Sequence, residues 1–383
     1  MTAVPTAPTV PLPPASGAWR EGDPPGRRQW YVRDGPLALE AGGELPGVRL
    51  AFETWGRLAP DRSNAVLVLH ALTGDSHAAG AAGPGHPAPG WWDGLIGAGH
   101  ALDTDRWFVV APNVLGGCQG STGPSSRAPG GRRWGGRFPF LTPRDQVAAE
   151  AGLADALGID RWALVAGGSM GGMRALEWAV SYPERTRALL VLATAAAASA
   201  EQIAWADLQL HAIRGDPHWR GGDYHDAGPG LGPHAGLGLA RRLAHVTYRS
   251  EPELQARFGR APQGAEEPWH GGRYQVASYL DHHAAKLVRR FDAGSYVTLT
   301  EAMNSHDVGR GRGGTRAALS RVTARTLVAG VDSDRLYPLR QQAELAAGIP
   351  AADRLRVIAS PCGHDGFLVE QEQVAALVRE LLG

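Results

Sequence analysis

The fold of this chain is decided by one stretch, Trp162-Ala163-Leu164-Val165-Ala166-Gly167-Gly168-Ser169-Met170-Gly171-Gly172-Met173-Arg174. Its first half is an apolar run typical of a buried strand, and apolar residues then recur at helical spacing up to Val180. Between the two, residues 167–171 fit the G-x-S-x-G pattern of a sharp strand-to-helix turn, which lets a serine hydroxyl project above the sheet. We therefore predict that Ser169 is a nucleophile and that the backbone N–H of Met170 helps to hold an oxyanion.

The pattern alone is weak evidence, because the chain contains 52 glycines and G-x-S-x-G can occur by chance. The alternative is a glycine-rich turn between a strand and a helix in some other α/β protein. The immediate succession of strand, turn and helix favours the nucleophilic turn.

The bulk properties exclude several classes of protein. Thirty-eight basic residues balance 38 acidic ones, which gives no sign of a nucleic acid or an acidic membrane surface as partner. The two cysteines, Cys118 and Cys362, do not form a disulfide framework, and no apolar run approaches the length of a membrane span. Residues 1–16 lack the basic start and apolar centre of a signal peptide, so we expect a cytoplasmic protein. Residues 1–28 are rich in proline and predict a disordered tail.

Further apolar runs alternate with helical patterns along the chain. Such runs, without polar alternation, are typical of strands buried on both faces of a parallel sheet that carries helices on each side. A threonine followed by proline, arginine and aspartate at residues 142–145 predicts the start of one of these helices. The predicted buried strands are residues 65–70, 107–111, 162–168, 188–193, 326–330 and 355–359.

The composition changes in residues 199–304. This segment is helical in pattern, polar, and rich in tryptophan, histidine and arginine, with no run that resembles a buried strand. We interpret it as a helical lid inserted into a core made of residues 29–198 and 305–383.

The acid and the base of a catalytic triad are expected in loops that follow late strands, in the chain order Ser, Asp, His. Asp332 and Asp334 both follow the strand at 326–330, and either could be the acid or a surface turn residue. His364 follows the last strand, where the base belongs. The loop after the strand at 65–70 supplies the second oxyanion donor in this architecture, which makes Leu72 the candidate. His70, which ends that strand, is either a base or a buried histidine that bonds the loop backbone.

These motifs resemble those of the homoserine O-acetyltransferases of the α/β-hydrolase superfamily. The resemblance runs from about residue 35 to the end, and several of its strings lie outside the catalytic loops, so the general fold does not require them. The matching strings are residues 70–77 (HALTGDSH), 113–118 (NVLGGC), 167–173 (GGSMGGM), 278–281 (SYLD), 290–293 (RFDA), 307–311 (DVGRG), 334–338 (DRLYP) and 363–368 (GHDGFL).

The resemblance implies a function and assigns further residues. It makes Asp334 the acid, and it places Arg241 and Asp365 against the carboxylate and the ammonium of an amino-acid substrate. The implied reaction is a ping-pong transfer of an acetyl group from acetyl-CoA, as co-substrate, to L-homoserine in methionine biosynthesis. No metal and no further cofactor are expected. The family is also expected to form a homodimer through the lid.

Two other functions use the same residues differently. A serine esterase or peptidase would have the same triad with water as acceptor, and a catalytically silent α/β protein would act as a binding module. Within the family, relatives use succinyl-CoA or serine instead. The Gly116-Gly117-Cys118 string resembles the acetyl-using members.

Overall fold

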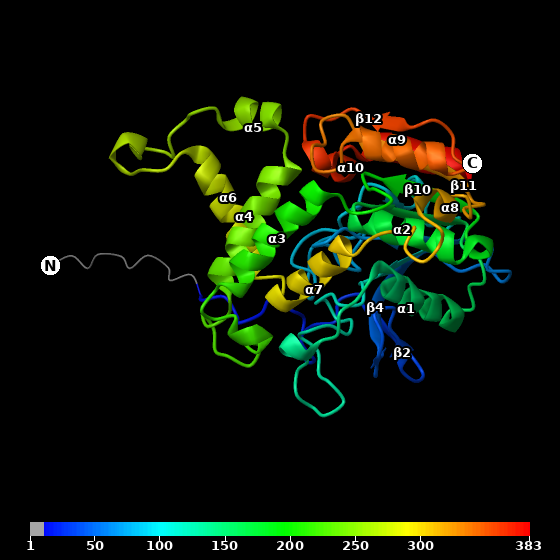
Figure 1. Cartoon of the computed structure of the whole chain (residues 1–383), viewed down its shortest axis with the longest axis horizontal. Helices are drawn as coiled ribbons and strands as arrows, with labels where there is room; N and C mark the ends of the chain where they lie inside the picture. Colours follow the sequence, from blue (N-terminus) through cyan, green and yellow to red (C-terminus); the bar gives the residue numbers. More distant parts are fainter. Residues whose placement is uncertain (1–10) are drawn as a thin grey trace.

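The computed structural model describes residues 11–383, and an eight-stranded sheet forms its centre (Figure 1). The first two pairings in the sheet, β1 with β4 and β4 with β8, are antiparallel, and all the others are parallel. The predicted α/β-hydrolase fold with a mostly parallel sheet is confirmed. The strand order is β1 (Gln29–Val32), β4 (Arg49–Trp55), β8 (Phe108–Pro112), β5 (Ala65–Leu69), β9 (Leu164–Gly168), β10 (Ala188–Leu192), β11 (Arg325–Val331) and β12 (Arg356–Ile358).

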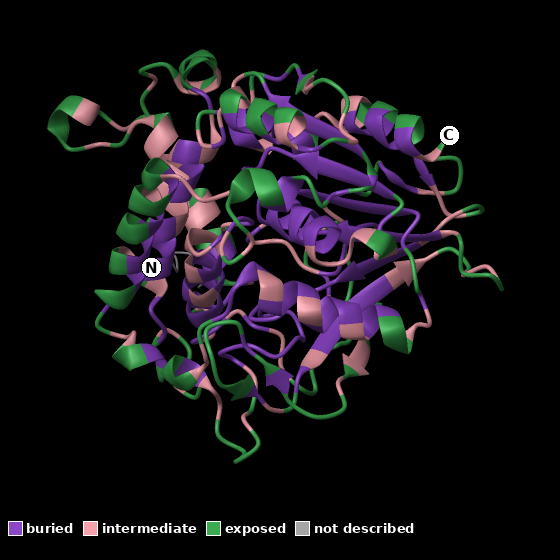
Figure 2. Ribbon diagram, turned by 45° about the vertical axis from the view of Figure 1, so that its right-hand side comes forward, coloured by how far each residue is buried: buried purple, intermediate pink, exposed green. Residues whose placement is uncertain are grey.

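Both faces of the sheet are buried, which explains the continuous apolar runs. In β5, Leu67 and Leu69 pack into a core with α1 (Pro143–Ala156), α2 (Met170–Ser181) and α9 (Leu339–Gly348). Val66 and Val68 point to the opposite face, where α11 (Gln371–Leu382) packs. Figure 2 shows the same pattern, with buried strands and helices exposed on their outer sides.

Helix α1 begins as the sequence predicts. Thr142 accepts from the backbone N–H of Asp145, whose carboxylate accepts in return from the Thr142 N–H, and Pro143 takes the first helical position. Such a capping box satisfies two backbone donors that have no partner inside the helix.

Five helices follow β10 in the segment interpreted as the lid (Figure 1). The chain enters and leaves this segment at one place, where Ala197 and Asp307 form an antiparallel bridge. The Ala198 N–H donates to the His306 carbonyl, and the Val308 N–H donates to the Ala196 carbonyl. The helices are α3 (Ala200–Arg214), α4 (His234–Tyr248), α5 (Glu251–Phe258), α6 (Gln275–Val288) and α7 (Ala293–Asn304).

The remaining elements are short. Among the described residues, no helix is long and apolar enough to cross a membrane. The short elements are β2 (Leu37–Ala38), β3 (Glu44–Leu45), β6 (Ile96–Gly97), β7 (Leu102–Asp103), α8 (Thr315–Leu319), α10 (Gly366–Val369) and the 3-10 turns η1 (Gly135–Arg137), η2 (Pro183–Arg185), η3 (Arg220–Gly222), η4 (Pro268–His270) and η5 (Gly363–Asp365).

The prediction of a disordered tail over residues 1–28 is wrong for residues 11–28, and residues 1–10 lie outside the described residues. Ser16 is buried and its hydroxyl donates to Asp292 Oδ1 at 2.7 Å. The Trp19 N–H donates to the Cys118 carbonyl at 3.0 Å, and Arg28 is buried with its Nε on the Gln119 carbonyl. The segment is irregular chain held by single polar anchors, which leave no periodic pattern in the sequence.

Candidate active site

Ser169 stands on a strained turn between β9 and α2. Its φ of 56° and ψ of −124° lie where non-glycine residues are seldom found. A Cβ at position 167 would lie 2.3 Å from the Gly171 carbonyl oxygen, and one at position 171 would lie 2.0 Å from the Leu69 carbonyl oxygen. Only glycine fits at these two positions, which is the physical reason for the G-x-S-x-G pattern.

The structure brings Ser169, His364 and Asp334 into one hydrogen-bonded chain. Ser169 Oγ lies 2.8 Å from His364 Nε2, and His364 Nδ1 lies 2.7 Å from Asp334 Oδ2. The other carboxylate oxygen of Asp334 accepts from the backbone N–H groups of Leu336 and Tyr337, both at 2.9 Å. All three side chains are buried. They therefore have the geometry of a nucleophile, a base and an orienting acid.

The positions of Asp332 and Asp334 also decide which of them is the acid of the triad. Asp332 is exposed, and its carboxylate accepts from the Ser360 N–H at 3.0 Å, away from the imidazole. Asp334 is the aspartate in contact with His364.

The surroundings of His364 favour proton uptake. Burial lowers the pKa of the imidazole, but the charge and the hydrogen bond of Asp334 outweigh burial, so the pKa of His364 is raised above its ordinary value. Tyr337 stacks on the ring at 5.0 Å and Phe367 meets it edge-on at 5.6 Å. With Nδ1–H directed at Asp334, Nε2 is free to accept the serine proton.

The side chains of the two candidate oxyanion donors, Leu72 and Met170, belong to one buried cluster. Met170 is the first residue of α2, so its N–H has no acceptor within the helix. Leu72 lies buried in the loop after β5. Among the hydrogen bonds of residues 11–383, neither backbone N–H has an acceptor. Both groups are therefore available for a substrate oxygen.

His70 serves the loop and not the chemistry. Its Nε2 accepts from the Val114 N–H at 3.0 Å, so its Nδ1 carries the proton and donates to the Ala71 carbonyl at 2.8 Å. Burial, reinforced by the nearby Arg174 charge, lowers the pKa of His70 to about 3. The imidazole is neutral and hydrogen-bonded at both nitrogens. It therefore fixes the backbone next to Leu72 and is unsuited to act as a base.

A buried ion pair supports the same loop and was missed by reasoning from sequence. Arg174 Nη1 lies 2.6 Å from Glu150 Oε1 on α1, and Arg174 Nη2 donates to the His70 carbonyl at 2.7 Å. Glu150 also accepts from Trp178 Nε1 at 2.9 Å. The pair joins α1, α2 and the end of β5. The available signal was a charged side chain inside the otherwise apolar start of α2.

The Tyr248 ring lies between Arg241 of α4 and the imidazole of His364. Its guanidinium carbon is 5.8 Å from the centre of the Tyr248 ring, which in turn is 5.7 Å from the His364 ring. Its Nη1 lies 3.5 Å from Thr73 Oγ1, and its buried Nε has no hydrogen-bond partner. No ion pair within residues 11–383 includes Arg241. A half-buried cation without a counter-ion suits a substrate carboxylate.

Asp365 follows His364 and already has a partner. Its Oδ2 lies 3.3 Å from Arg249 Nη2, and it occupies the N-cap position of α10 without a capping bond from its side chain. Binding of a substrate ammonium by Asp365 remains a prediction.

A cavity of about 50 Å³ opens beside the triad under the lid. Leu72 and Tyr337 line it from the core, and Trp205, Gln209 and Tyr248 line it from the lid. The cavity therefore lies between the candidate oxyanion loop and the helices α3 and α4 of the lid.

One cluster of metal-ligating side chains occurs in the described part of the chain, at Glu53, His77 and His86. Several of its polar atoms are already engaged, whereas His77 Nε2 and His86 Nδ1 are buried without a hydrogen-bond partner. Glu53 accepts from Ser76 Oγ at 2.9 Å and pairs with His77 Nδ1 at 3.1 Å, and His86 Nε2 accepts from the Arg27 N–H at 3.2 Å. We interpret the cluster as a buried hydrogen-bond network.

The fold and the triad define the class of protein. A family model described as "alpha/beta hydrolase fold" matches residues 64–371, so the chain is an α/β-hydrolase by fold.

The curated relatives then specify the family. A homoserine O-acetyltransferase of Thermobifida fusca (strain YX) is 70% identical over 374 residues, which is 98% of each chain. One of Leifsonia xyli is 59% identical over 96% of this chain and 92% of the relative. The chain belongs to the homoserine O-acetyltransferase family.

Solved structures with the same fold carry two kinds of name. A homoserine O-acetyltransferase of Bacillus anthracis is 28% identical with a TM-score of 0.84, over 93% of this chain and 97% of the other. A structure named esterase E22 is 26% identical with a TM-score of 0.83, over 93% and 99%. At this level of identity the fold accommodates both acyl transfer and ester hydrolysis.

Proposed function

We propose that the chain transfers the acetyl group of acetyl-CoA to the γ-hydroxyl of L-homoserine, through an acetyl ester on Ser169, as a step of methionine biosynthesis. The observation that carries the proposal is the Ser169–His364–Asp334 chain, assembled under the lid in a protein 70% identical to a named homoserine O-acetyltransferase. A nucleophile, a base and an orienting acid are what a two-step acyl transfer requires.

In the first half-reaction, His364 Nε2 takes the hydroxyl proton while Ser169 Oγ attacks the thioester carbon. The oxyanion is held by the N–H groups of Leu72 and Met170, each worth about 2.7–4 kcal/mol of barrier. The carbon–sulfur bond then breaks, and the sulfur takes the proton from His364. CoA leaves as the thiol, and Ser169 carries the acetyl group.

In the second half-reaction, His364 takes the proton of the homoserine γ-hydroxyl, whose oxygen attacks the acetyl carbon. The bond to Ser169 Oγ breaks, and the serine regains its proton from His364. Arg241 binds the homoserine carboxylate, as its missing counter-ion suggests, and Asp365 binds the ammonium.

Ester hydrolysis is the second candidate, because the esterase structures share the fold and the relay requires only water as acceptor. Transfer competes with hydrolysis only if water is kept from the acetyl-serine. The lid helices α3 and α4, which line the cavity beside the oxyanion loop, support transfer because they limit the access of water.

The test is a matrix of donors and acceptors on the full chain, with release of CoA thiol as the measurement. Acetyl-CoA and succinyl-CoA are each combined with homoserine, with serine and with no acceptor. We expect release that requires acetyl-CoA and homoserine and that disappears in Ser169→Ala. Release without an acceptor supports hydrolysis, and release only with succinyl-CoA or serine changes the substrate and keeps the mechanism.

We further propose a cytoplasmic homodimer that associates through the lid. Leu239 of α4 and Trp269 beside α6 expose large apolar side chains, by 49% and 83%. Light scattering across a wide concentration range tests the assembly, and a mass of one chain throughout contradicts it.

A further inference from the structure

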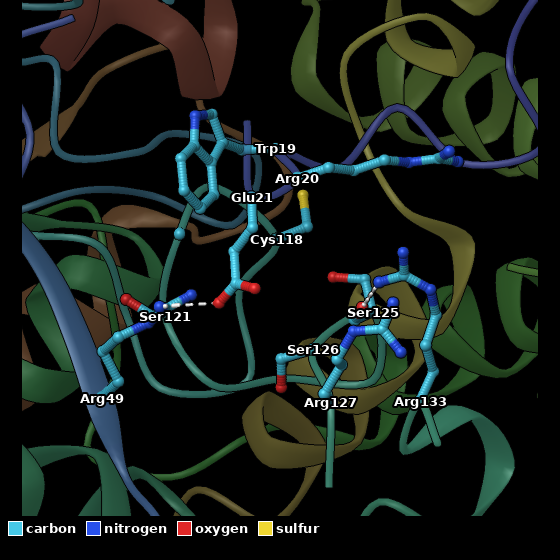
Figure 3. A pocket seen from close by; sticks show the side chains of 11 residues that line it. Trp19, Arg20, Glu21, Arg49, Cys118, Ser121, Ser125, Ser126, Arg127 and Arg133 are labelled. Atoms are coloured by element: carbon cyan, nitrogen blue, oxygen red, sulfur yellow. Dashed lines mark hydrogen bonds and ion pairs between the residues drawn. The ribbon is translucent and has the colours of Figure 1, made fainter. Parts of the chain in front are cut away.

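A second cavity, of about 250 Å³, shares no lining residue with the cavity at the triad. Its walls come from the N-terminal segment, from β4 and from the loops on either side of residue 124 (Figure 3). Arg20, Arg49, Arg127 and Arg133 line it, against Glu21 as the acidic member of the lining. The cavity is therefore strongly positive.

Glu21 neutralises little of the positive charge of these arginines. Glu21 pairs with Arg49 at 3.2 Å, but its side chain is 70% exposed, so solvent screens the pair. Within residues 11–383, Arg20 and Arg127 take part in no ion pair. Arg133 pairs with Asp226, whose side chain is 81% exposed. An anion that enters the cavity meets at least two cations without a buried counter-ion.

The local backbone places two of these cations together. Arg127 and Arg133 form an antiparallel bridge across the hairpin that connects them, and Figure 3 shows their guanidinium groups on the same side of the cavity. Like charges directly opposite each other destabilise a strand pair. Arg127 Nη1 is anchored on the Gly131 carbonyl at 2.7 Å, and Arg133 Nη1 donates to the Ser125 carbonyl. The arrangement places two positive charges where both can contact a doubly charged group.

An aromatic wall stands on the other side. The Trp19 indole lines the cavity, with the Arg49 guanidinium carbon 5.9 Å from its ring centre. The Trp19 indole N–H donates to the Pro24 carbonyl at 3.2 Å, which holds the ring in position. Cationic groups opposite a flat ring are suited to a phosphate that is attached to a planar base.

The cavity lies at the functional edge of the sheet. The loop with Cys118 and Ser121 follows the carboxyl end of β8, which is paired with β5 in parallel. Its Val114 N–H donates to His70, beside the candidate oxyanion loop. Ligands of open α/β sheets bind outside the carboxyl ends of the strands.

We propose that this cavity binds an adenine nucleotide phosphate, with Arg127 and Arg133 as the phosphate clamp and Trp19 as the wall for the base. One source of this chemistry is the nucleotide end of the acyl-CoA donor, and another is a free nucleotide that acts as an effector. The site itself does not depend on the proposed reaction, and only the choice between the two sources rests on it.

The test uses adenosine 3′,5′-bisphosphate as probe, in calorimetric titrations of the full chain. The wild type is expected to bind it, with affinity that falls as salt rises. The double variant Arg127→Gln/Arg133→Gln is expected to bind it at least about ten-fold more weakly, because charge-assisted hydrogen bonds are lost. Arg132→Gln is the matched control, since Arg132 is exposed on the same hairpin and does not line this cavity. Circular dichroism and thermal unfolding verify that each variant is folded.

Absence of binding to the wild type, or equal affinity in the wild type and a folded double variant, overturns the proposal. The source is then identified by kinetics. A raised KM for acetyl-CoA, with unchanged turnover of the acetyl thioester of N-acetylcysteamine, which has no phosphate, assigns the site to the donor. An unchanged KM for acetyl-CoA together with lost nucleotide binding assigns it to a free nucleotide. If the chain hydrolyses esters instead of transferring them, the titrations still test the site.

Discussion

Ser169 holds its hydroxyl in place through a backbone conformation that costs energy. Its positive φ is imposed by the sheet on one side and by α2 on the other. Residues in such sparsely populated regions cost about 1–3 kcal/mol each. The strain keeps Oγ above the strand end, within reach of His364.

Replacing Ser169 by glycine should therefore increase stability while it removes activity. Ser169→Gly and Ser169→Ala both lose the bond to His364, but only glycine relaxes the backbone. We expect the glycine variant to be more stable than the alanine variant by about 1–3 kcal/mol, measured by urea unfolding. Equal stabilities would show that the turn is not strained.

Asp334 sets the protonation of the base. Asp334→Asn should lower kcat roughly 10⁴-fold, because the imidazole loses its orienting acid. Since Asp334 raises the pKa of His364, the variant should also keep its remaining activity to a lower pH. The pH dependence of kcat/KM measures both effects. Asp332→Asn, at the exposed neighbour, is the control and should leave the profile unchanged.

At the scale of elements, α1, α2 and the end of β5 form one unit through Glu150 and Arg174. The sequence is sufficient to predict each of these elements, because hydrophobic spacing and caps are local signals. It is not sufficient to predict that Arg174 reaches the His70 carbonyl, because that contact joins positions 104 residues apart. The candidate triad was predictable only because the fold restricts which loops can supply it.

Replacing one member of the Glu150–Arg174 pair should lower the free energy of unfolding more than replacing both members. Arg174→Met leaves Glu150 buried without a counter-charge, and we expect a loss of about 3–5 kcal/mol in the free energy of unfolding. Glu150→Met/Arg174→Met should recover part of it. If the double variant is as unstable as the sum of the single variants, the two side chains are not coupled. Where Arg174→Met folds, kcat should fall more than KM changes, because the oxyanion loop loses its support.

At the scale of the whole molecule, Asp292 connects the N-terminal segment with two elements of the lid. It accepts from Ser16 of the N-terminal segment, from Tyr224 in the lid and from the Ser295 N–H of α7. His225 Nε2 lies 3.0 Å away. The order of the N-terminal segment rests in part on this distant carboxylate, and such a contact leaves no local pattern in the sequence.

Asp292→Asn should destabilise the protein in a manner that depends on pH. Burial raises the pKa of Asp292, but His225 and the hydrogen bonds outweigh it and hold the pKa below its ordinary value. The charged form therefore adds stability above the unfolded pKa of about 3.9, and this is lost as the pH falls further. We expect a cost of about 3–5 kcal/mol at pH 7 that shrinks in acid, measured by urea unfolding.

The exposed Asp226→Asn is the control for that series. Its side chain is 81% exposed, so the change should stay within about 0.5 kcal/mol at every pH. A cost for Asp292→Asn that does not vary with pH would rule out a charged carboxylate as the connection.

The bridge between Ala197 and Asp307 brings the two ends of the helical insertion together. A segment whose ends already meet can be replaced by another of different length without moving the strands on either side. The core would then keep its acylation chemistry while the inserted helices change the acceptor. A chimaeric protein joined at these two positions is therefore the natural starting point for redirecting the acceptor.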